Sequence, residues 1–392
     1  MPQQAAEPAP PVRRIHSLDG LRSGLMLLGV VLHSAYPYSD GARWLVRDPQ
    51  RNSFFQALTQ GIHLFRMPAF FLVAGYFAAL LLRQSKPGDF LRERLRRIGV
   101  PLLSTLFTLN LLQTWLLQKR SSAHSWLPSG DEVQLMWSSG SIVGHLWFLV
   151  YLLLFCALVA AGAASIKRFT LSRWPARLAT HAGFSAMLGL AMACSLGVVA
   201  LDHLAPAVLN HEYLGLIDPS ELLAYLPFFC VGLLLETDEA LLLRFSSPGP
   251  YTPLAGLAAF AAMTASTGLP GLAGKSLHLL ASTLLVWLVI RMLFSAFRRI
   301  ASEASPRFRY LSDASYSIYL MHHLIVVALA SWLLTVHWGA WLKFGIVLAV
   351  TVGLSLAIHH FLILRHPLLR FLFNGKSLGC TRTNGLGIQP AG

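Results

Sequence analysis

The chain has 392 residues, of which 55% are apolar and only 12% are charged. Soluble domains average about 25% charged residues, so this composition excludes an ordinary soluble globule, and the apolar fraction excludes a disordered chain. On so hydrophobic a chain, the net charge of +14 indicates membrane topology rather than nucleic-acid binding. Four cysteines with no CxxC pair indicate neither a disulfide framework nor a metal or redox centre. The composition therefore predicts an all-α, polytopic integral membrane protein.

Residues 1–13 are polar and rich in Ala and Pro, without the apolar core of a signal peptide, so we expect this segment to stay cytoplasmic. A bilayer core of about 30 Å needs roughly 20 apolar residues per helix. Ten spans of this kind are predicted, over 21–38, 61–82, 98–118, 142–164, 182–201, 219–235, 252–268, 276–294, 314–335 and 341–363. They define one membrane domain over 14–367, followed by a cytoplasmic tail over 368–392.

The distribution of basic residues between these spans predicts the orientation of the chain. With the N-terminus inside, the inner segments hold 22 Lys and Arg, Arg291 among them, whereas the outer loops hold 7, including Lys275 and Lys343. Arg22 and Arg66 fall within spans. Cytoplasmic loops of membrane proteins carry an excess of Lys and Arg. Both termini are therefore expected on the cytoplasmic side.

The first span contains two ionisable residues, Arg22 and His33, that are costly at membrane depth and are therefore candidates for function. Arg22 and His33 lie eleven residues apart, which places them on one helical face with a rise of about 16 Å between them. Asp19 falls on the same face, where it could orient the guanidinium of Arg22. The alternative is that Arg22 is an interfacial anchor and His33 a hydrogen-bonded core residue.

The second span carries a similar pair. His63 and Arg66 are neighbours on one helical face, at a predicted depth similar to that of His33. An arginine at this depth needs a partner or an anionic ligand. The alternative is a structural Arg66 bonded to backbone carbonyls near Pro68.

The fourth and ninth spans contribute further polar residues. His145 lies near the outer end of the fourth span. The ninth span places one polar stripe at spacings of 3, 4 and 3 residues, made of Ser312, Ser315, Tyr319 and His322. The stripe could join helices by hydrogen bonds or line a cavity. We expect spans one, two, four and nine to enclose His33.

A cluster of basic residues follows the second span in the sequence RERLRRIGVPLL. It consists of Arg92, Arg94, Arg96 and Arg97. These arginines could set topology or contact lipid phosphates. They could instead bind a phosphorylated donor from the cytosol.

Together these motifs resemble the membrane-bound acyltransferase family 3. The match runs from about Arg14 to Pro367 and rests on five features in order: SLDGLR with the Arg-x10-His pair, FRMPAFFLVAGYF, the RxxR loop, HLWFL, and SYSIYLMH. The IHLFRMPAFF, HLWFL and RxRxGVP runs look more like members that modify osmoregulated periplasmic glucans than like lipopolysaccharide O-acetylases. The chain departs from the family at RHPL, residues 365–368, so no role is assigned there.

The resemblance implies an O-acyltransferase of the bacterial inner membrane that moves a succinyl group, or alternatively an acetyl group, from cytosolic acyl-CoA to glucan hydroxyls in the periplasm. Acyl-CoA is then a co-substrate, and no metal or permanently bound cofactor is expected. Its donor-binding residues would be Arg22, Asp19, Arg94 and Arg97. His33 would act as general base, with His63 or Arg66 stabilising the oxyanion. The cavity would be lined by His145, Ser315, Tyr319 and His322.

Two other classes of function fit the same residues. In a small-molecule or proton-coupled transporter, the same histidines would relay protons. Within the enzyme class, an acetyltransferase for another envelope glycan is a further alternative. A non-catalytic scaffold of an envelope synthesis complex is the third class. The expected partners are the lipid bilayer, acyl-CoA and the glucan, with a second copy of the chain or the glucan synthesis machinery as further candidates and no nucleic acid.

Overall fold

The computed structural model describes residues 16–376 apart from 42–43, 122–142, 164, 166–184, 186–187, 199, 202–203, 210–212, 214–215 and 302–304. Within these residues the chain is helical, with only two isolated β-bridges. The longer helices are α1 (His16–Ala35), α2 (Ser53–Arg83), α5 (Leu111–Ser121), α7 (Trp147–Ala161), α11 (Pro219–Leu235), α13 (Thr252–Ser266), α14 (Gly271–Ile300), α15 (Pro306–Leu333) and α16 (Ala340–Ala357). The shorter ones are α3 (Pro87–Arg94), α4 (Val100–Thr105), α10 (Pro206–Leu209), α12 (Glu239–Phe245) and α17 (Pro367–Asn374). The predicted all-α fold is confirmed.

Six helices in the described residues are long and apolar enough to cross a membrane. They cover Ser53–Arg83, Pro87–Leu117, Gly144–Ala161, Gly271–Ile300, Phe308–Leu333 and Ala340–Ile363. Three shorter apolar helices cover Leu188–Val198, Pro219–Leu235 and Thr252–Ser266. Each of the ten predicted ranges overlaps one of these nine helices or α1. Part of the fifth range lies outside the described residues. The count of ten spans and the cytoplasmic termini stay predictions.

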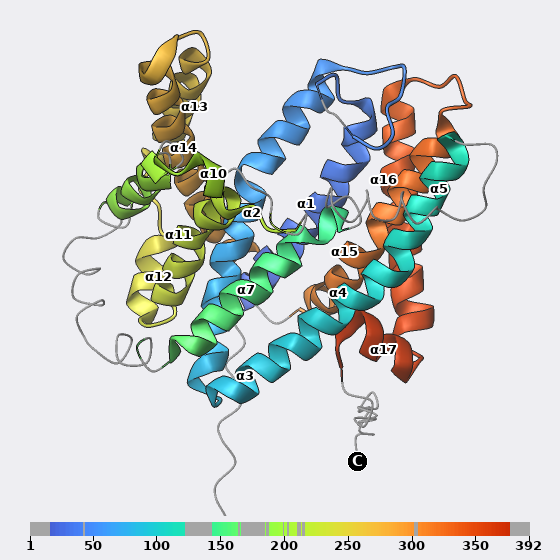
Figure 1. Cartoon of the computed structure of the whole chain (residues 1–392), viewed down its shortest axis with the longest axis horizontal. Helices are drawn as coiled ribbons and strands as arrows, with labels where there is room; N and C mark the ends of the chain where they lie inside the picture. The colour runs from blue at the N-terminus through green and yellow to red at the C-terminus, as the bar shows by residue number, and fades with distance from the viewer. Residues whose placement is uncertain are drawn as a thin grey trace, which may run out of the picture.

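Helix α1 lies at the centre of the bundle, where it contacts α2, α14, α15 and α16 (Figure 1). Its apolar residues recur around most of its circumference, as expected of a helix buried on several sides. Leu21 and Leu25 are almost fully buried in the main core. Because α1 carries both Arg22 and His33, its central position puts each of them in contact with several other helices.

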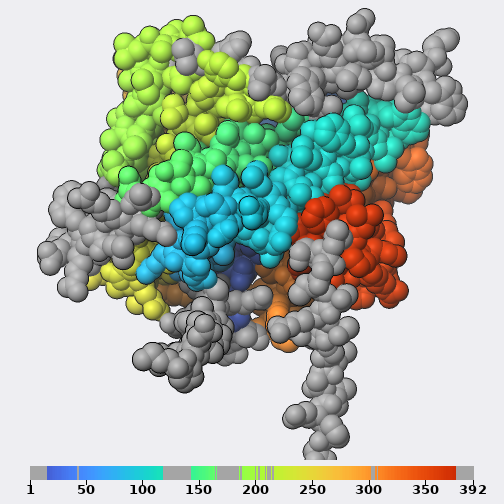
Figure 2. Space-filling model, turned by 60° about the horizontal axis from the view of Figure 1, so that its bottom comes forward, coloured from blue at the N-terminus to red at the C-terminus, as the bar shows by residue number. Residues whose placement is uncertain are grey.

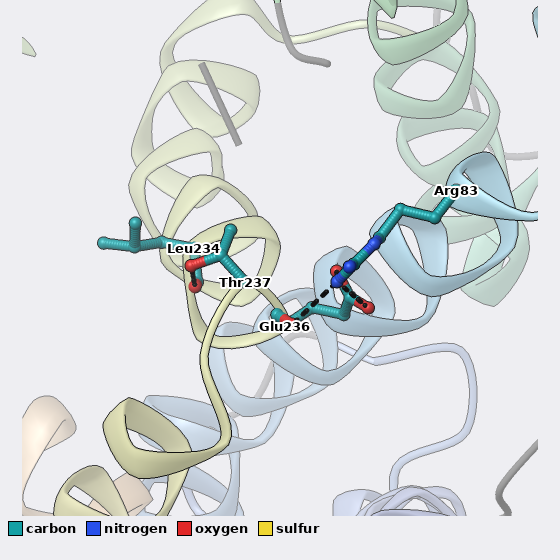
Figure 3. A network of polar contacts seen from close by, with 4 residues as sticks. All are labelled: Arg83, Leu234, Glu236 and Thr237. Carbon is teal, nitrogen blue, oxygen red and sulfur yellow. Dashed lines mark hydrogen bonds and ion pairs between the residues drawn. The ribbon is translucent and has the colours of Figure 1, made fainter. Parts of the chain in front are cut away.

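Helices α2 and α11 cross at very close range. A Cβ added at Gly75 would overlap the carbonyl oxygen of Phe229, and one at Gly232 would overlap that of Leu72. Small residues allow helix backbones in a membrane protein to approach in this way. At the ends of the same two helices, Arg83 donates to both carboxylate oxygens of Glu236 at 3.0 and 3.1 Å (Figure 3). This crossing holds α2, the helix of His63 and Arg66, against the rest of the bundle.

The arginine-rich segment is one long helix with two π-helical stretches. Leu95–Gly99 follows α3 and Leu106–Asn110 follows α4, and π segments of this kind occur often at functional sites. Helix α17 packs on α4, and Figure 2 shows the two helices side by side on one face of the molecule. Gly375, at φ +59°, ends α17 in the left-handed conformation and lies directly against the backbone of Arg96 and Arg97. The start of the predicted tail therefore packs on the basic segment.

Two basic residues assigned to loops have structural roles instead. Lys343 lies in α16, is 2% exposed, and forms an ion pair of 2.7 Å with Asp48 in the segment between α1 and α2. Arg291 is buried in α14 and donates to the backbone carbonyl groups of Phe245, Arg244 and Ser247. Both residues lie within helices of the bundle, so their assignment to an inner and an outer loop was wrong.

Candidate active site

Four histidines from three separate parts of the chain meet near the end of α1. The ring centre of His33 lies 5.1 Å from that of His322, 4.9 Å from that of His323 and 6.4 Å from that of His145. His145 comes from the 3-10 turn Gly144–Leu146 before α7, and it stacks on His323 at 4.4 Å. His322 and His323 are adjacent residues of α15. The histidines expected from spans one, four and nine are thus brought together.

Hydrogen bonds orient two of the four rings. His322 donates from Nδ1 to the carbonyl oxygen of Tyr319, and His323 donates from Nδ1 to Oε1 of Gln113, both at 2.6 Å. Because these oxygens can only accept, Nδ1 carries the proton in each ring and Nε2 keeps its lone pair. Tyr319 in turn donates its hydroxyl proton to the carbonyl oxygen of His145. Two imidazoles in the cluster are therefore held as proton acceptors.

Several polar atoms of this cluster are buried without a hydrogen-bond partner among the described residues. They are Nδ1 of His33, both ring nitrogens of His145, Nε2 of His322 and Nε of Arg66. Buried polar groups are almost always satisfied, and exceptions concentrate where a protein binds or reacts. The cluster thus offers several proton donors and acceptors to a polar ligand. In the described part of the chain, no three His, Cys, Asp or Glu side chains are arranged to hold a metal ion.

Arg66 brings a positive charge to the histidine cluster from α2. Its side chain is 9% exposed, and its guanidinium lies against Gly29 of α1, where a Cβ would overlap it. It lies within electrostatic range of His33 and His145. No ion pair of Arg66 with a carboxylate is formed within the described residues. A buried cation beside the imidazoles can stabilise negative charge that develops on a reacting oxygen.

A second site lies toward the start of α1, in a cavity of about 200 Å³. Its lining includes four basic side chains and one carboxylate, from Arg22, Arg94, Arg97, Lys376 and Asp313. The excess of positive charge suits an anionic ligand, and guanidinium groups bind phosphate by paired hydrogen bonds. We refer to it as the arginine cavity.

The basic residues of the arginine cavity differ in how firmly they are paired. Arg22 donates to Oγ of Ser312 at 3.1 Å and lies 3.5 Å from the carboxylate of Asp19. Arg97 forms a close ion pair with Glu93. Arg94 has a buried Nε without a partner among the described residues. Arg22 and Arg94 are therefore better placed than Arg97 to receive an anionic ligand.

Aromatic side chains stand between the arginine cavity and the histidine cluster. Phe70 and Phe148 line the cavity and contact each other edge to face at 4.9 Å. Phe148 also packs at 4.8 Å against the ring of Tyr319, which lies 5.4 Å from that of His145. The contacts from the arginine cavity to the histidine cluster thus run through the aromatic rings of Phe148 and Tyr319. We call Phe70 and Phe148 the aromatic neck.

Two predicted site residues, His63 and Ser315, lie outside the histidine cluster and the arginine cavity. His63 is exposed and lines a different pocket, together with Tyr36 and Thr59, rather than joining the histidine cluster. The hydroxyl of Ser315 donates to the carbonyl oxygen of Ser312 within α15, and Ser315 is not among the residues that line the arginine cavity.

Sequence reasoning missed two members of the cluster. His323 is adjacent to His322, so the His-His dipeptide of the ninth span was a signal for it. Gln113 carried no such signal, because its role depends on α5 and α15 lying side by side.

Comparison with known proteins shows the family of this chain. The profile of the acyltransferase family 3, described as an acyltransferase domain, matches residues 15–360. The chain belongs to this acyltransferase family. It is 28% identical over 381 residues to the glucans biosynthesis protein C of Escherichia coli strains SMS-3-5 and K12, covering 93% of this chain and 96% of each relative. No solved structure matches the chain. The helices and the two polar sites described above therefore belong to a multi-pass membrane acyltransferase.

Proposed function

We propose that this acyltransferase moves an acyl group from acyl-CoA to hydroxyl groups of a periplasmic glucan. The observation that carries the proposal is the placement of two complementary sites at opposite ends of α1, a basic cavity and a cluster of histidines. The name of the E. coli relatives, glucans biosynthesis protein C, supports a glucan as acceptor. Succinyl-CoA is the proposed donor, with acetyl-CoA as the alternative. The proposed location is the bacterial inner membrane.

The arginine cavity is the proposed site for the phosphates of the donor. Arg22 and Arg94 supply guanidinium groups from α1 and α3, while Asp19 holds Arg22 in position. Phosphate oxygens would replace Ser312 as acceptors of the Arg22 hydrogen bonds. Arg97 contributes less, because its charge is already paired with Glu93. With the proposed cytoplasmic N-terminus, this cavity faces the compartment that contains acyl-CoA.

The histidine cluster is the proposed site of acyl transfer. His33 takes the proton of the acceptor hydroxyl while the oxygen of that hydroxyl attacks the carbonyl carbon of the thioester. Arg66 stabilises the oxyanion of the tetrahedral intermediate. As that intermediate collapses, the carbon–sulfur bond breaks and the proton held by His33 passes to the departing thiolate. His145 and His322 present further ring nitrogens that hold the acceptor hydroxyl or the carbonyl oxygen.

The length of α1 suits an extended donor. The rise from Arg22 to His33 is about 16 Å, a distance that the flexible arm of CoA can bridge between its phosphates and its thioester. The arm has to pass the aromatic neck, since Phe70 and Phe148 lie between the two sites. In this proposal the apolar neck admits the thin arm of CoA and keeps bulk water from the thioester, which favours transfer over hydrolysis.

The test uses purified protein in detergent with succinyl-CoA or acetyl-CoA and a neutral gluco-oligosaccharide. We expect release of free CoA that depends on the oligosaccharide, with a mass increase of the oligosaccharide by one succinyl or one acetyl unit. The mass of that unit identifies the donor. Absence of acceptor-dependent CoA release with both donors would overturn the proposal. Uptake of a solute into vesicles without a covalent product would instead favour a transporter.

A further inference from the structure

A third pocket lies beside the histidine cluster, on the side away from the arginine cavity. It has a volume of about 220 Å³ and is formed by the outer turns of α2 and the segment that follows α1. In Figure 1 this segment lies at the top, opposite α3 and α17. The lining residues that α2 contributes follow helical spacing and lie on one face of that helix; they are Gln56, Thr59, Gln60 and His63. Tyr36 and Ser39 lie in the opposite wall. We call it the outer pocket.

The chemistry of the outer pocket suits an uncharged ligand rich in hydroxyl groups. None of its lining residues carries a permanent charge, in contrast to the arginine cavity. Amide side chains such as those of Gln56 and Gln60 both donate and accept hydrogen bonds, which matches hydroxyl groups that do the same. The hydroxyl of Ser39 is buried and has no hydrogen-bond partner among the described residues. An unsatisfied buried hydroxyl in the wall points to a polar ligand.

Aromatic side chains connect the outer pocket to the histidine cluster. The ring of Tyr36 lies 5.7 Å from that of His33 and stacks on Trp44 at 5.9 Å. Trp44 also contacts His323 at 5.6 Å. A ligand in the outer pocket therefore touches a residue that adjoins His33, and flat aromatic faces offer apolar contact to a sugar ring. One ligand could thus hold a hydroxyl at His33 while its neighbouring hydroxyl groups bind the amides.

We infer that the outer pocket is the acceptor subsite, where Gln60 and His63 bind the sugar unit next to the one that is acylated. The inference rests on the proposed function, because a sugar acceptor gives the pocket its ligand. Assigning the outer pocket as the acceptor subsite also gives His63 a role other than oxyanion stabilisation. His63 binds the acceptor, and Arg66 alone, buried beside the cluster, faces the oxyanion.

The test measures donor and acceptor separately for Gln60→Ala and His63→Ala. Both side chains are exposed, so their removal leaves the core intact. Each variant should raise the acceptor KM, and the Kd of a neutral gluco-oligosaccharide titrated without donor, about five- to tenfold through the loss of one or two hydrogen bonds. The KM for acyl-CoA should not change. Gln84→Ala, the same substitution at the other end of α2 and outside the pocket, is the matched control and should match wild type.

The outcomes separate this inference from the proposed function. Acylation by wild type with an unchanged acceptor KM in both variants would overturn the subsite and leave the acyl transfer standing. Wild-type protein that does not bind the oligosaccharide would also overturn the subsite. Wild-type protein that binds the oligosaccharide but releases no CoA would overturn the proposed function, and the binding titration of Gln60→Ala and His63→Ala would still decide whether the pocket binds sugar.

Discussion

Replacement of Arg22 and of His33 should impair the enzyme in two different ways, although the two residues lie on one face of one helix. Arg22 belongs to the arginine cavity and His33 to the histidine cluster, with the aromatic neck between them. Arg22→Ala removes a charged contact to the donor and should weaken donor binding. His33→Ala removes a base that acts only in the transition state, so donor binding should be almost intact while turnover falls.

The expected magnitudes follow from the contacts of each side chain. A hydrogen bond to a charged group contributes about 1.5–3 kcal/mol, so Arg22→Ala should raise the Kd of acyl-CoA about 10- to 150-fold. Arg22→Lys should restore only part of this affinity, since an ammonium group cannot reproduce the paired hydrogen bonds of a guanidinium. Loss of a general base typically lowers the rate 10²–10⁴-fold, and we expect a decrease of about this size in kcat for His33→Ala or His33→Gln.

The assay combines calorimetric titration of acyl-CoA with the rate of acceptor-dependent CoA release. Thermal unfolding of each variant in detergent checks that the bundle is intact. Arg92→Ala is the matched control for Arg22→Ala, because Arg92 is an exposed arginine of α3 that does not line the arginine cavity. The reasoning is refuted if His33→Ala loses donor affinity as completely as Arg22→Ala. His33 would then be a donor contact rather than a base.

Three further predictions follow from contacts elsewhere in the bundle. Lys343→Met should destabilise the protein by about 3–5 kcal/mol, since it leaves the buried carboxylate of Asp48 unpaired, and Asp48→Asn in the same chain should recover most of the loss in thermal unfolding. Gly75→Ala should cost about 1–3 kcal/mol at the α2–α11 crossing, whereas Gly61→Ala in the same helix, with open space around it, should not lower the unfolding temperature. Arg94→Glu should raise the KM for acyl-CoA without affecting membrane insertion, and an unchanged KM would limit Arg94 to a role in topology.

Much of the architecture could be predicted because the membrane restricts the structures that a chain can adopt. Backbone groups in lipid have to be satisfied within their own segment, so a long apolar run is a helix. The ranges 61–82 and 341–363 accordingly lie within α2 and within the helix Ala340–Ile363. Hydropathy was less reliable for deciding whether a single charged residue lies in a loop or inside the bundle. Lys343 looks like a loop residue by its place near a span boundary, but its carboxylate partner Asp48 is 295 residues away in the sequence.

The candidate site was predictable in part for a related reason. Helical periodicity alone places Arg22 and His33 on one face, and the structure has them at the two separate sites that this spacing suggests. Periodicity also grouped His63 with Arg66 on α2, yet only Arg66 reaches the cluster. Residues on one helical face still differ in depth and in the helix that they meet, and neither property is encoded in their spacing.

The sequence by itself determined the class of protein, the helical segments and the residues that carry charge or imidazole at membrane depth, because these depend on composition and on contacts within one helix. Only the tertiary structure decided that His33 meets His145, His322 and His323, that Gln113 orients His323, and that two phenylalanines separate the histidines from the arginine cavity. These contacts join α1, α5, α7 and α15, and they depend on which helices become neighbours when the bundle packs. Packing is set by the fit of whole helix surfaces, which no local pattern of residues specifies.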